Sequence, residues 1–134
     1  MKSHYRAVVI GGGVVGASAL YHLAKMGWND VVLVEKIEYT SGSTWHAAGL
    51  LPLFNMSYSV GKIHKYSVDL YQSLEEETGQ HVSFHKTGNL RLARNQERMD
   101  EYKRYCGTAS TIGVPFEMIG PAEIKKLWPF AKVD

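Results

Sequence analysis

The chain has 134 residues, of which 45% are hydrophobic and 21% are charged, and its formal net charge is +2. These values are typical of a small globular protein with one modest core. The net charge is too small, and the Lys and Arg too dispersed, for a nucleic-acid-binding protein, and every apolar run is too short to span a membrane.

The single cysteine, Cys106, excludes an intramolecular disulfide and suits a reducing compartment. The first residues, MKSHYR, lead directly into an apolar run, so the sequence predicts no signal peptide. We therefore expect a cytoplasmic protein with neither a membrane nor a nucleic acid as its partner.

The first elements along the chain predict a βαβ unit. The apolar run AVVI (Ala7–Ile10) precedes three glycines and is typical of a strand covered on both faces. Apolar residues then recur at helical spacing from residue 14 to residue 26, and Gly27 is a suitable C-terminal stop. A second apolar run, VVLV (Val31–Val34), predicts a parallel strand reached by a right-handed crossover.

Small and polar residues occupy positions 40 to 49, and a long helix is expected from Tyr58 to Thr78, closed by Gly79. The inward side of that helix is predicted to consist of Val60, Ile63, Leu70, Tyr71 and Leu74. The following segment, HVSFHKTGNLRLA, predicts two short strands around a turn at residues 87–89.

The last part of the chain predicts two more helices. Asn95 is a candidate cap for a helix that runs to about Thr111. The apolar side of this helix is expected to consist of Met99, Tyr102, Cys106 and Ala109. Residues 114–119 predict a further strand, and Pro121 begins a final short helix that ends before Pro129.

The segment VVIGGGVVGASA carries the pattern G-x-G-x-x-G at the predicted turn from strand to helix. Gly11 permits a tight turn, Gly13 lets the backbone approach a pyrophosphate, and Gly16 lets the helix pack closely on the strand. The pyrophosphate is then expected to bind the free N–H groups at the start of the helix. A glycine-rich turn of purely structural importance is the alternative.

An acidic residue follows the second predicted strand. Glu35 lies 24 residues after Gly11, where a carboxylate accepts hydrogen bonds from an adenosine ribose. It disfavours NADP, because a carboxylate repels a 2′-phosphate, and the neighbouring Lys36 is expected to point to the opposite face. The loop alone does not separate FAD from NAD, although an NAD enzyme predicts a third apolar strand soon after Glu35, which this sequence lacks.

Longer motifs carry a more specific resemblance. VVIGGGVVGASALYHLAKMGWNDVVLVEK, TSGSTWHAAGLL, KTGNLRLA and IGVPFEMIGPAEIKKLWP together resemble the N-terminal region of the dimethylglycine and sarcosine dehydrogenase family. These enzymes are FAD-dependent amine oxidoreductases related to glycine oxidase and D-amino-acid oxidase. The most specific piece is STWHAAG, because many unrelated flavin and nicotinamide proteins share the glycine pattern.

The resemblance implies a flavoenzyme that oxidises an N-methyl amine such as dimethylglycine or sarcosine by hydride transfer to FAD. The product is then hydrolysed to formaldehyde or passes its carbon to tetrahydrofolate in a downstream domain. The resemblance also implies that His46 links the flavin covalently and that Ser43 and Thr44 lie near the pyrophosphate and flavin. Two alternatives are an NAD-dependent dehydrogenase and a non-catalytic regulatory relative that keeps the fold.

The expected fold class is α/β: a Rossmann-like FAD-binding βαβ unit in residues 1–80, followed by the start of an α+β substrate domain in residues 81–134. Because only two parallel strands are identifiable, we expect the N-terminal part of a larger two-domain flavoenzyme, inactive alone. No catalytic residue or metal site is expected within it. The predicted cofactor-binding residues are Gly11, Gly13, Val15, Gly16, Glu35, Lys36, Ser43, Thr44, His46, Ala48, Gly49 and Leu50.

Overall fold

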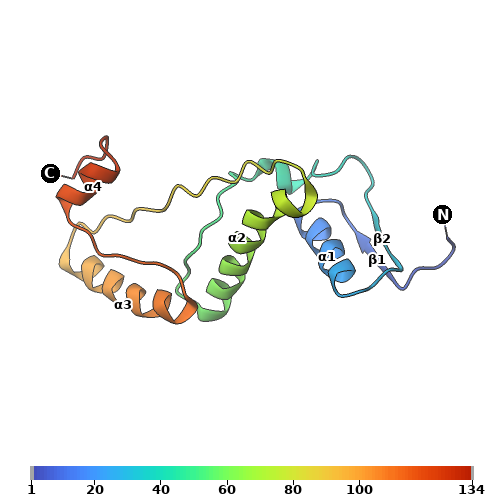
Figure 1. Cartoon of the computed structure of the whole chain (residues 1–134), viewed down its shortest axis with the longest axis horizontal. Coiled ribbons are helices and arrows are strands. Elements are labelled where there is room, and N and C mark those ends of the chain that lie inside the picture. Colours follow the sequence, from blue (N-terminus) through green and yellow to red (C-terminus); the bar gives the residue numbers. More distant parts are fainter. Residues whose placement is uncertain (1, 134) are drawn as a thin grey trace. The chain divides into compact units, whose positions relative to one another are not determined.

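The structure is a computed structural model that describes residues 2–133 (Figure 1). It divides into two compact units, Met1–Leu50 and Leu51–Asp134. The first unit contains the glycine-rich turn, and the second contains the longest helices. The domain boundary expected after residue 80 concerns the domains of a complete enzyme and stays a prediction.

The first unit is built on the predicted βαβ arrangement. Strand β1 (Ala7–Ile10) and strand β2 (Val31–Val34) are parallel, with Ala7 opposite Val31 and Ile10 opposite Val34. Helix α1 (Val14–Lys25) connects them and ends before Gly27. The α/β fold class is therefore confirmed, and the apolar runs lie in the two strands as expected.

The sheet of the first unit is covered on one face only. Side chains of β1 alternate between half-buried and exposed positions, and Val8 and Ile10 are 52% and 85% exposed. The prediction that this strand is covered on both faces is therefore wrong for the described residues. A two-stranded sheet with one crossover helix supplies a single packing layer, which leaves the second apolar face bare.

Within residues 51–133, the second unit contains three helices, α2 (Tyr58–Thr78), α3 (Gln96–Ile112) and α4 (Pro121–Leu127). Helix α2 has the predicted bounds and is followed by Gly79 in a left-handed conformation. The side chain of Asn95 accepts a hydrogen bond from the backbone N–H of Arg98 at 2.9 Å, so the predicted cap of α3 is confirmed. Pro121 begins α4, as expected.

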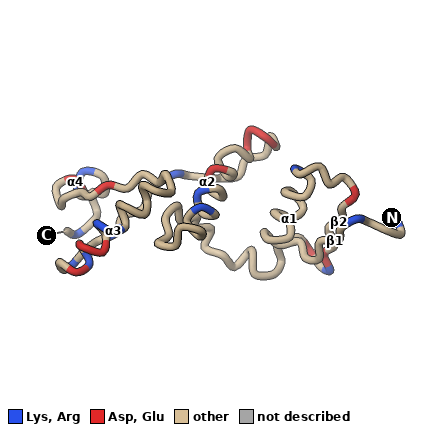
Figure 2. Tube along the Cα trace, turned by 90° about the horizontal axis from the view of Figure 1, so that it is seen from below, with Lys and Arg blue, Asp and Glu red and all other residues tan. Residues whose placement is uncertain are grey.

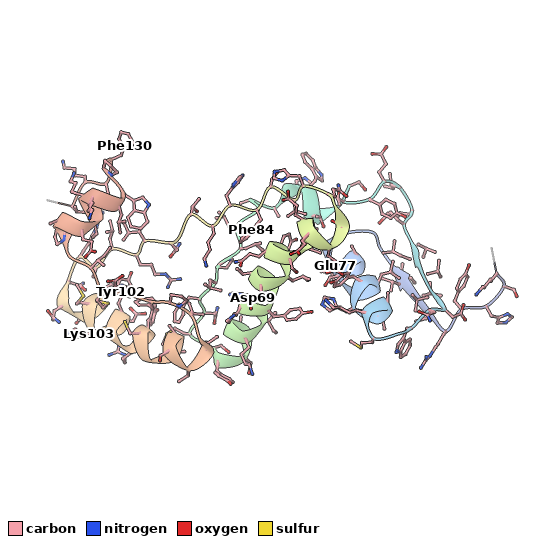
Figure 3. The ribbon with its side chains drawn as sticks, in the orientation of Figure 1. Asp69, Glu77, Phe84, Tyr102, Lys103 and Phe130 are labelled. Carbon is pink, nitrogen blue, oxygen red and sulfur yellow. The ribbon has the colours of Figure 1, made fainter. Side chains whose placement is uncertain are left out.

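The core of the second unit lies between the end of α3 and the chain beside it. Its buried members are Ala109, Ile112 and Val114, against which Leu53, Phe54 and Phe116 pack. Helix α2 approaches α3 through Gly61, where a Cβ atom would lie 2.5 Å from Cδ1 of Ile112. Beyond this core, Phe130 is fully exposed, as Figure 3 shows.

The buried side of α2 agrees with the predicted one at Leu70, Tyr71 and Leu74, which are half-buried, and differs from it in the first two turns. Gly61 and Val68 are buried, whereas Val60 and Ile63 are 39% and 64% exposed. Close packing at a glycine selects this side, because a residue without a side chain lets the two helices approach. A pattern of apolar residues does not predict a contact that is made by a glycine.

The strands expected in the second unit are absent from its described residues. Residues 81–94 and 114–120 form neither helix nor strand, and the sheet of residues 2–133 consists of β1 and β2. The alternation of Leu90, Arg91 and Leu92 therefore indicates an extended segment without a neighbouring strand to complete a hydrogen-bond ladder. The guanidinium carbon of Arg91 lies 5.7 Å from the ring centre of Phe54 and 5.6 Å from that of Tyr105.

Charged residues of both signs are interspersed along α2 and α3 (Figure 2). Lys65 lies 2.6 Å from Asp69, and Lys103 lies 3.0 Å from Asp100. These pairs are exposed, so each contributes little to stability. Among the described residues, a helix with the length and apolar character needed for a membrane span is not found.

The contact between Gly61 and Ile112 predicts a measurable coupling between the two helices. We expect Gly61→Ala to destabilise the full-length protein by about 1 kcal/mol, because overpacking costs about 1–3 kcal/mol and exceeds the helix propensity gained by alanine. In an Ile112→Val background, which lacks the obstructing Cδ1 atom, the same substitution should stabilise. Urea unfolding of all four proteins in a double-mutant cycle measures this coupling, and additive effects would contradict it.

Candidate nucleotide-binding site

A tight glycine-rich turn joins β1 to α1. Gly11 has a φ of 106°, a left-handed conformation that glycine adopts without steric cost. Its N–H donates to the carbonyl oxygen of Val34 at 2.8 Å, which ties the ends of the two strands together. A Cβ atom at Gly16 would lie 1.8 Å from the carbonyl oxygen of Gly11. Helix α1 therefore passes directly against the turn.

The N-terminus of α1 presents several backbone N–H groups. Its N-cap residue, Gly13, makes no side-chain cap, and its first turn holds no acidic residue. The N–H of Val14 donates to Oγ1 of Thr44 at 2.9 Å. Within residues 2–133, the N–H groups of Gly13, Val15 and Gly16 find no acceptor. Three open donors at the positive end of a helix dipole suit an oxyanion such as phosphate.

The carboxylate of Glu35 lies beside the same turn. Its Oε2 accepts from the N–H of Gly12 at 2.6 Å, and its Oε1 accepts from the N–H groups of Lys36 and Ile37 at 2.7 and 3.1 Å. These backbone hydrogen bonds, first of all that from Gly12, lower the pKa of Glu35 below its ordinary value of 4.5. At neutral pH the group is therefore an ionised acceptor, and its remaining lone pairs are available to hydroxyl groups.

An open depression adjoins this carboxylate, and its walls consist of Leu33, Val34, Glu35, Ile37, Glu38 and Tyr39. The ring of Tyr39 lies against the glycine turn, because a Cβ atom at Gly12 would be 2.5 Å from its Cδ1. Gly12 and Tyr39 were not among the predicted site residues. The signal for them was the uninterrupted triple glycine, followed by an aromatic residue four positions after the acid.

His46 lies at the end of a single helical turn, η1 (Ser43–His46). Its Nδ1 lies 3.0 Å from the carbonyl oxygen of Gly42, and its ring centre lies 4.2 Å from that of Trp45. A carbonyl oxygen only accepts, so Nδ1 carries the hydrogen in this contact. In a neutral imidazole, Nε2 is then unprotonated and nucleophilic.

Backbone contacts tie the segment before η1 to the glycine turn. The N–H of Thr40 donates to the carbonyl oxygen of Gly12 at 3.0 Å, and the N–H of Trp45 donates to that of Thr40 at 3.3 Å. Together with the bond from Val14 to Thr44, these contacts bring η1 beside the start of α1. Residues separated by thirty positions thus meet at one end of the sheet.

The structure therefore brings together some of the predicted site residues and leaves others apart. The glycines of the turn, Glu35 and Thr44 are joined by contacts. Lys36 contributes its backbone N–H to Glu35, and its charge also helps to lower the pKa of that carboxyl group. The side chains of Val15 and Leu50 are 80% and 83% exposed. Ala48 and Gly49 follow η1 outside any helix or strand.

Among residues 2–133, no group of three or more His, Cys, Asp or Glu side chains is arranged to hold a metal ion. The site is accordingly described by its hydrogen-bond donors, one carboxylate and one imidazole.

Comparison with known proteins gives three findings. A family model described as DAO, FAD dependent oxidoreductase, matches residues 6–134. Mitochondrial dimethylglycine dehydrogenase of Rattus norvegicus is 48% identical over 133 residues, which cover 99% of this chain and 16% of that protein. Mitochondrial sarcosine dehydrogenase of Homo sapiens is 42% identical over 135 residues, which cover 100% of this chain and 15% of that protein.

A solved structure is also similar to this chain. The crystal structure of L-proline dehydrogenase from P. horikoshii superposes with a TM-score of 0.85 at 33% sequence identity. The match covers 96% of this chain and 34% of that one. The chain thus spans only 16% of the length of the rat relative and about a third of this structure.

The cytoplasmic location expected from the sequence is wrong. Both curated relatives are mitochondrial proteins, which conflicts with that assignment. The expectation depended on a single cysteine, on the lack of a long apolar run and on the lack of a predicted signal peptide. None of these features distinguishes the cytoplasm from the interior of a mitochondrion.

Proposed function

Because the chain belongs to the FAD dependent oxidoreductase family, we propose that the full-length protein oxidises an N-methyl amino acid such as dimethylglycine or sarcosine. The resemblance predicted from its motifs is confirmed by 48% and 42% identity to enzymes of these two names. FAD is the cofactor of the family. The observation that carries the proposal is the set of open N–H donors at α1 beside an ionised Glu35.

The described residues fit the nucleotide half of FAD. The open N–H groups of Gly13, Val15 and Gly16 are proposed to bind the pyrophosphate oxygens, and the lack of a side-chain cap from the N-cap residue supports this assignment. Glu35 is the acceptor proposed for the ribose hydroxyl groups. The small residues Ala48 and Gly49 are proposed to let the backbone pass close to the flavin ring.

His46 is the residue proposed to carry the flavin. Its Nδ1–H is held by the carbonyl oxygen of Gly42, so the unprotonated Nε2 is free to attack an electrophilic methyl carbon on the flavin ring. The link would replace one carbon–hydrogen bond of that methyl group by a nitrogen–carbon bond to His46. The methyl proton and the imidazole proton would leave, and with two electrons they would reduce molecular oxygen to hydrogen peroxide.

The reaction itself depends on groups of the full-length protein. FAD supplies an acceptor for the hydride that leaves the N-methyl carbon of the substrate. The oxidised carbon is proposed to be released as formaldehyde or transferred to tetrahydrofolate held by a further domain. Residues 1–134 contribute binding and positioning of the cofactor, and none of them is assigned a catalytic role.

An absorbance experiment tests the proposal directly. The purified full-length protein is expected to show the bands of oxidised flavin, which should bleach without oxygen when dimethylglycine or sarcosine is added. Flavin bands that neither substrate bleaches would favour the non-catalytic regulatory alternative. A protein that takes up NAD and retains no flavin would contradict the assignment altogether.

Glu35→Ala is expected to weaken the binding of ADP, a ligand that carries the ribose and pyrophosphate without the flavin. The affinity should fall by roughly tenfold to a hundredfold, because a charge-assisted hydrogen bond is lost. Calorimetry on the full-length apoprotein measures this effect. Glu117→Ala, which removes an exposed carboxylate from the second unit, is the matched control and should leave ADP binding unchanged. Equal affinity of the Glu35 variant and the wild type would remove the ribose assignment.

The pH dependence provides a second readout for Glu35. Its pKa is lowered in the folded state, so its contribution to stability is complete above the unfolded value, near 4.5. The contribution is lost as the pH falls through the folded pKa, because the protonated group no longer accepts from Gly12 as an anion. Glu35→Gln should therefore flatten the acid limb of the stability curve relative to wild type.

A further inference from the structure

The cap of α1 comes from a residue distant in sequence. Oγ1 of Thr44 accepts from the N–H of Val14 at 2.9 Å, across thirty positions of the chain. The N-cap residue itself, Gly13, has no side chain to do so, and a Cβ atom there would lie 2.9 Å from the same oxygen. The bare Gly13 thus makes room for the hydroxyl group of Thr44.

The hydroxyl group has a second capacity. A threonine oxygen accepts hydrogen bonds while its own O–H remains a donor. In the described part of the chain, no acceptor is found for the Thr44 O–H. A phosphate oxygen at the start of α1 can therefore accept a hydrogen bond from the Thr44 hydroxyl group. The Val14 N–H, at the positive end of the helix, polarises that hydroxyl group.

Thr44 also lies two residues before His46 in the same turn. The N–H of Ala47 donates to the carbonyl oxygen of Thr44 at 3.2 Å, which closes that turn. Any displacement of Thr44 is therefore transmitted to the imidazole through one hydrogen-bonded loop of backbone. Within this turn, the ring of Trp45 lies beside the ring of His46, and both side chains are exposed.

The other attachment of this segment is strained. Thr40, which donates to the carbonyl oxygen of Gly12, has a φ of 66°. A β-branched residue adopts this left-handed conformation only at a steric cost. The hydrogen bond from Thr40 to Gly12 is therefore made from a strained backbone conformation. The side-chain bond of Thr44 is consequently the unstrained attachment that holds η1 against α1.

We propose that Thr44 is a positioning residue for covalent attachment at His46, which couples the phosphate-binding end of α1 to the orientation of the imidazole. The inference rests on the proposed flavin link. It assigns to Thr44 a role in the rate of the link that is separate from affinity for the nucleotide. The cap from Thr44 to Val14 would keep the turn, and with it Nε2 of His46, in the orientation that the proposed attachment requires.

The test separates affinity from attachment. Full-length apoprotein, produced without riboflavin, is mixed with saturating FAD, and acid-stable flavin is followed with time, while ADP binding is measured separately. For Thr44→Val we expect attachment to slow by about tenfold or more, because small misplacements of reacting groups have large effects on rate. ADP affinity should fall by less than that factor. Thr44→Ser, which keeps the hydroxyl, should restore the wild-type rate.

Two further variants complete the design. Thr111→Val, at an exposed position of α3, makes the same substitution away from the site and should leave both quantities unchanged. Gly13→Ala pushes the Thr44 hydroxyl from the opposite side and should also slow attachment, which gives a second measurement if Thr44→Val does not fold. Equal attachment rates in wild type and Thr44→Val would overturn the inference alone. A wild type without acid-stable flavin would overturn the proposed link and this inference with it.

Discussion

Gly16→Ala is expected to remove FAD from the full-length protein and to destabilise it by about 3 kcal/mol or more, at the upper end of the range for overpacking. The added methyl group would lie 1.8 Å from the carbonyl oxygen of Gly11, and a backbone atom has no rotamer by which to move away. Either α1 shifts from the sheet or the turn opens. Both outcomes displace the N–H groups of Gly13 and Val15.

Urea unfolding and the flavin content of the purified protein measure the two effects of this substitution. Gly107→Ala is the control, because Gly107 also lies in a helix, α3, and a Cβ atom there would meet nothing within 4 Å. Alanine at that position should be neutral or stabilise by up to about 1 kcal/mol through helix propensity. If Gly16→Ala retained flavin and stability like this control, the close packing of α1 on the turn would be refuted.

His46→Ala is expected to abolish acid-stable flavin completely. The proposed link requires an unprotonated ring nitrogen, and Nε2 of His46 is that atom because Nδ1 donates to Gly42. Other histidines offer no substitute, since none of them belongs to η1. Denaturation in acid followed by a gel viewed under ultraviolet light should show a fluorescent band in wild type and none in the variant.

The matched control for this prediction is His85→Ala, which removes an exposed imidazole from the second unit and should keep the fluorescent band. The His46 variant should still take up FAD reversibly, because the turn and Glu35 are intact. Its flavin should be a weaker oxidant, since the covalent substituent withdraws electrons from the ring. Flavin that washes out of denatured wild-type protein would exclude a covalent link, whatever the variant shows.

Local signals accounted for most of the helices. Asn95 predicted the start of α3, Gly79 the end of α2, and Pro121 the start of α4, because caps and stops act within a few residues. The expected strands after residue 80 failed for the opposite reason. A strand depends on a neighbour distant in sequence, and alternation in KTGNLRLA carries no information about whether that neighbour is present.

The candidate site also has features that the sequence predicted and contacts that it did not predict. The spacing of Gly11, Gly13 and Gly16 predicted a tight turn, and the position of Glu35 placed a carboxylate at the end of β2. The bond from Val14 to Thr44 was beyond sequence reasoning, because it joins residues thirty positions apart through a loop of irregular backbone. The contact of Tyr39 with Gly12 was missed as well, because the middle glycine and the aromatic residue are visible in the sequence but their spacing does not specify a contact between them.

The exposed face and unpaired edge of β1 favour self-association of the polypeptide. Val8 and Ile10 present branched apolar side chains on a short strand whose only ladder, among the described residues, is with β2. Such an edge is a template for intermolecular pairing, and natural proteins protect it by covering, charging or bending it. Arg6 and Asp30 lie directly before the two strands, and charged residues in such flanking positions oppose self-association.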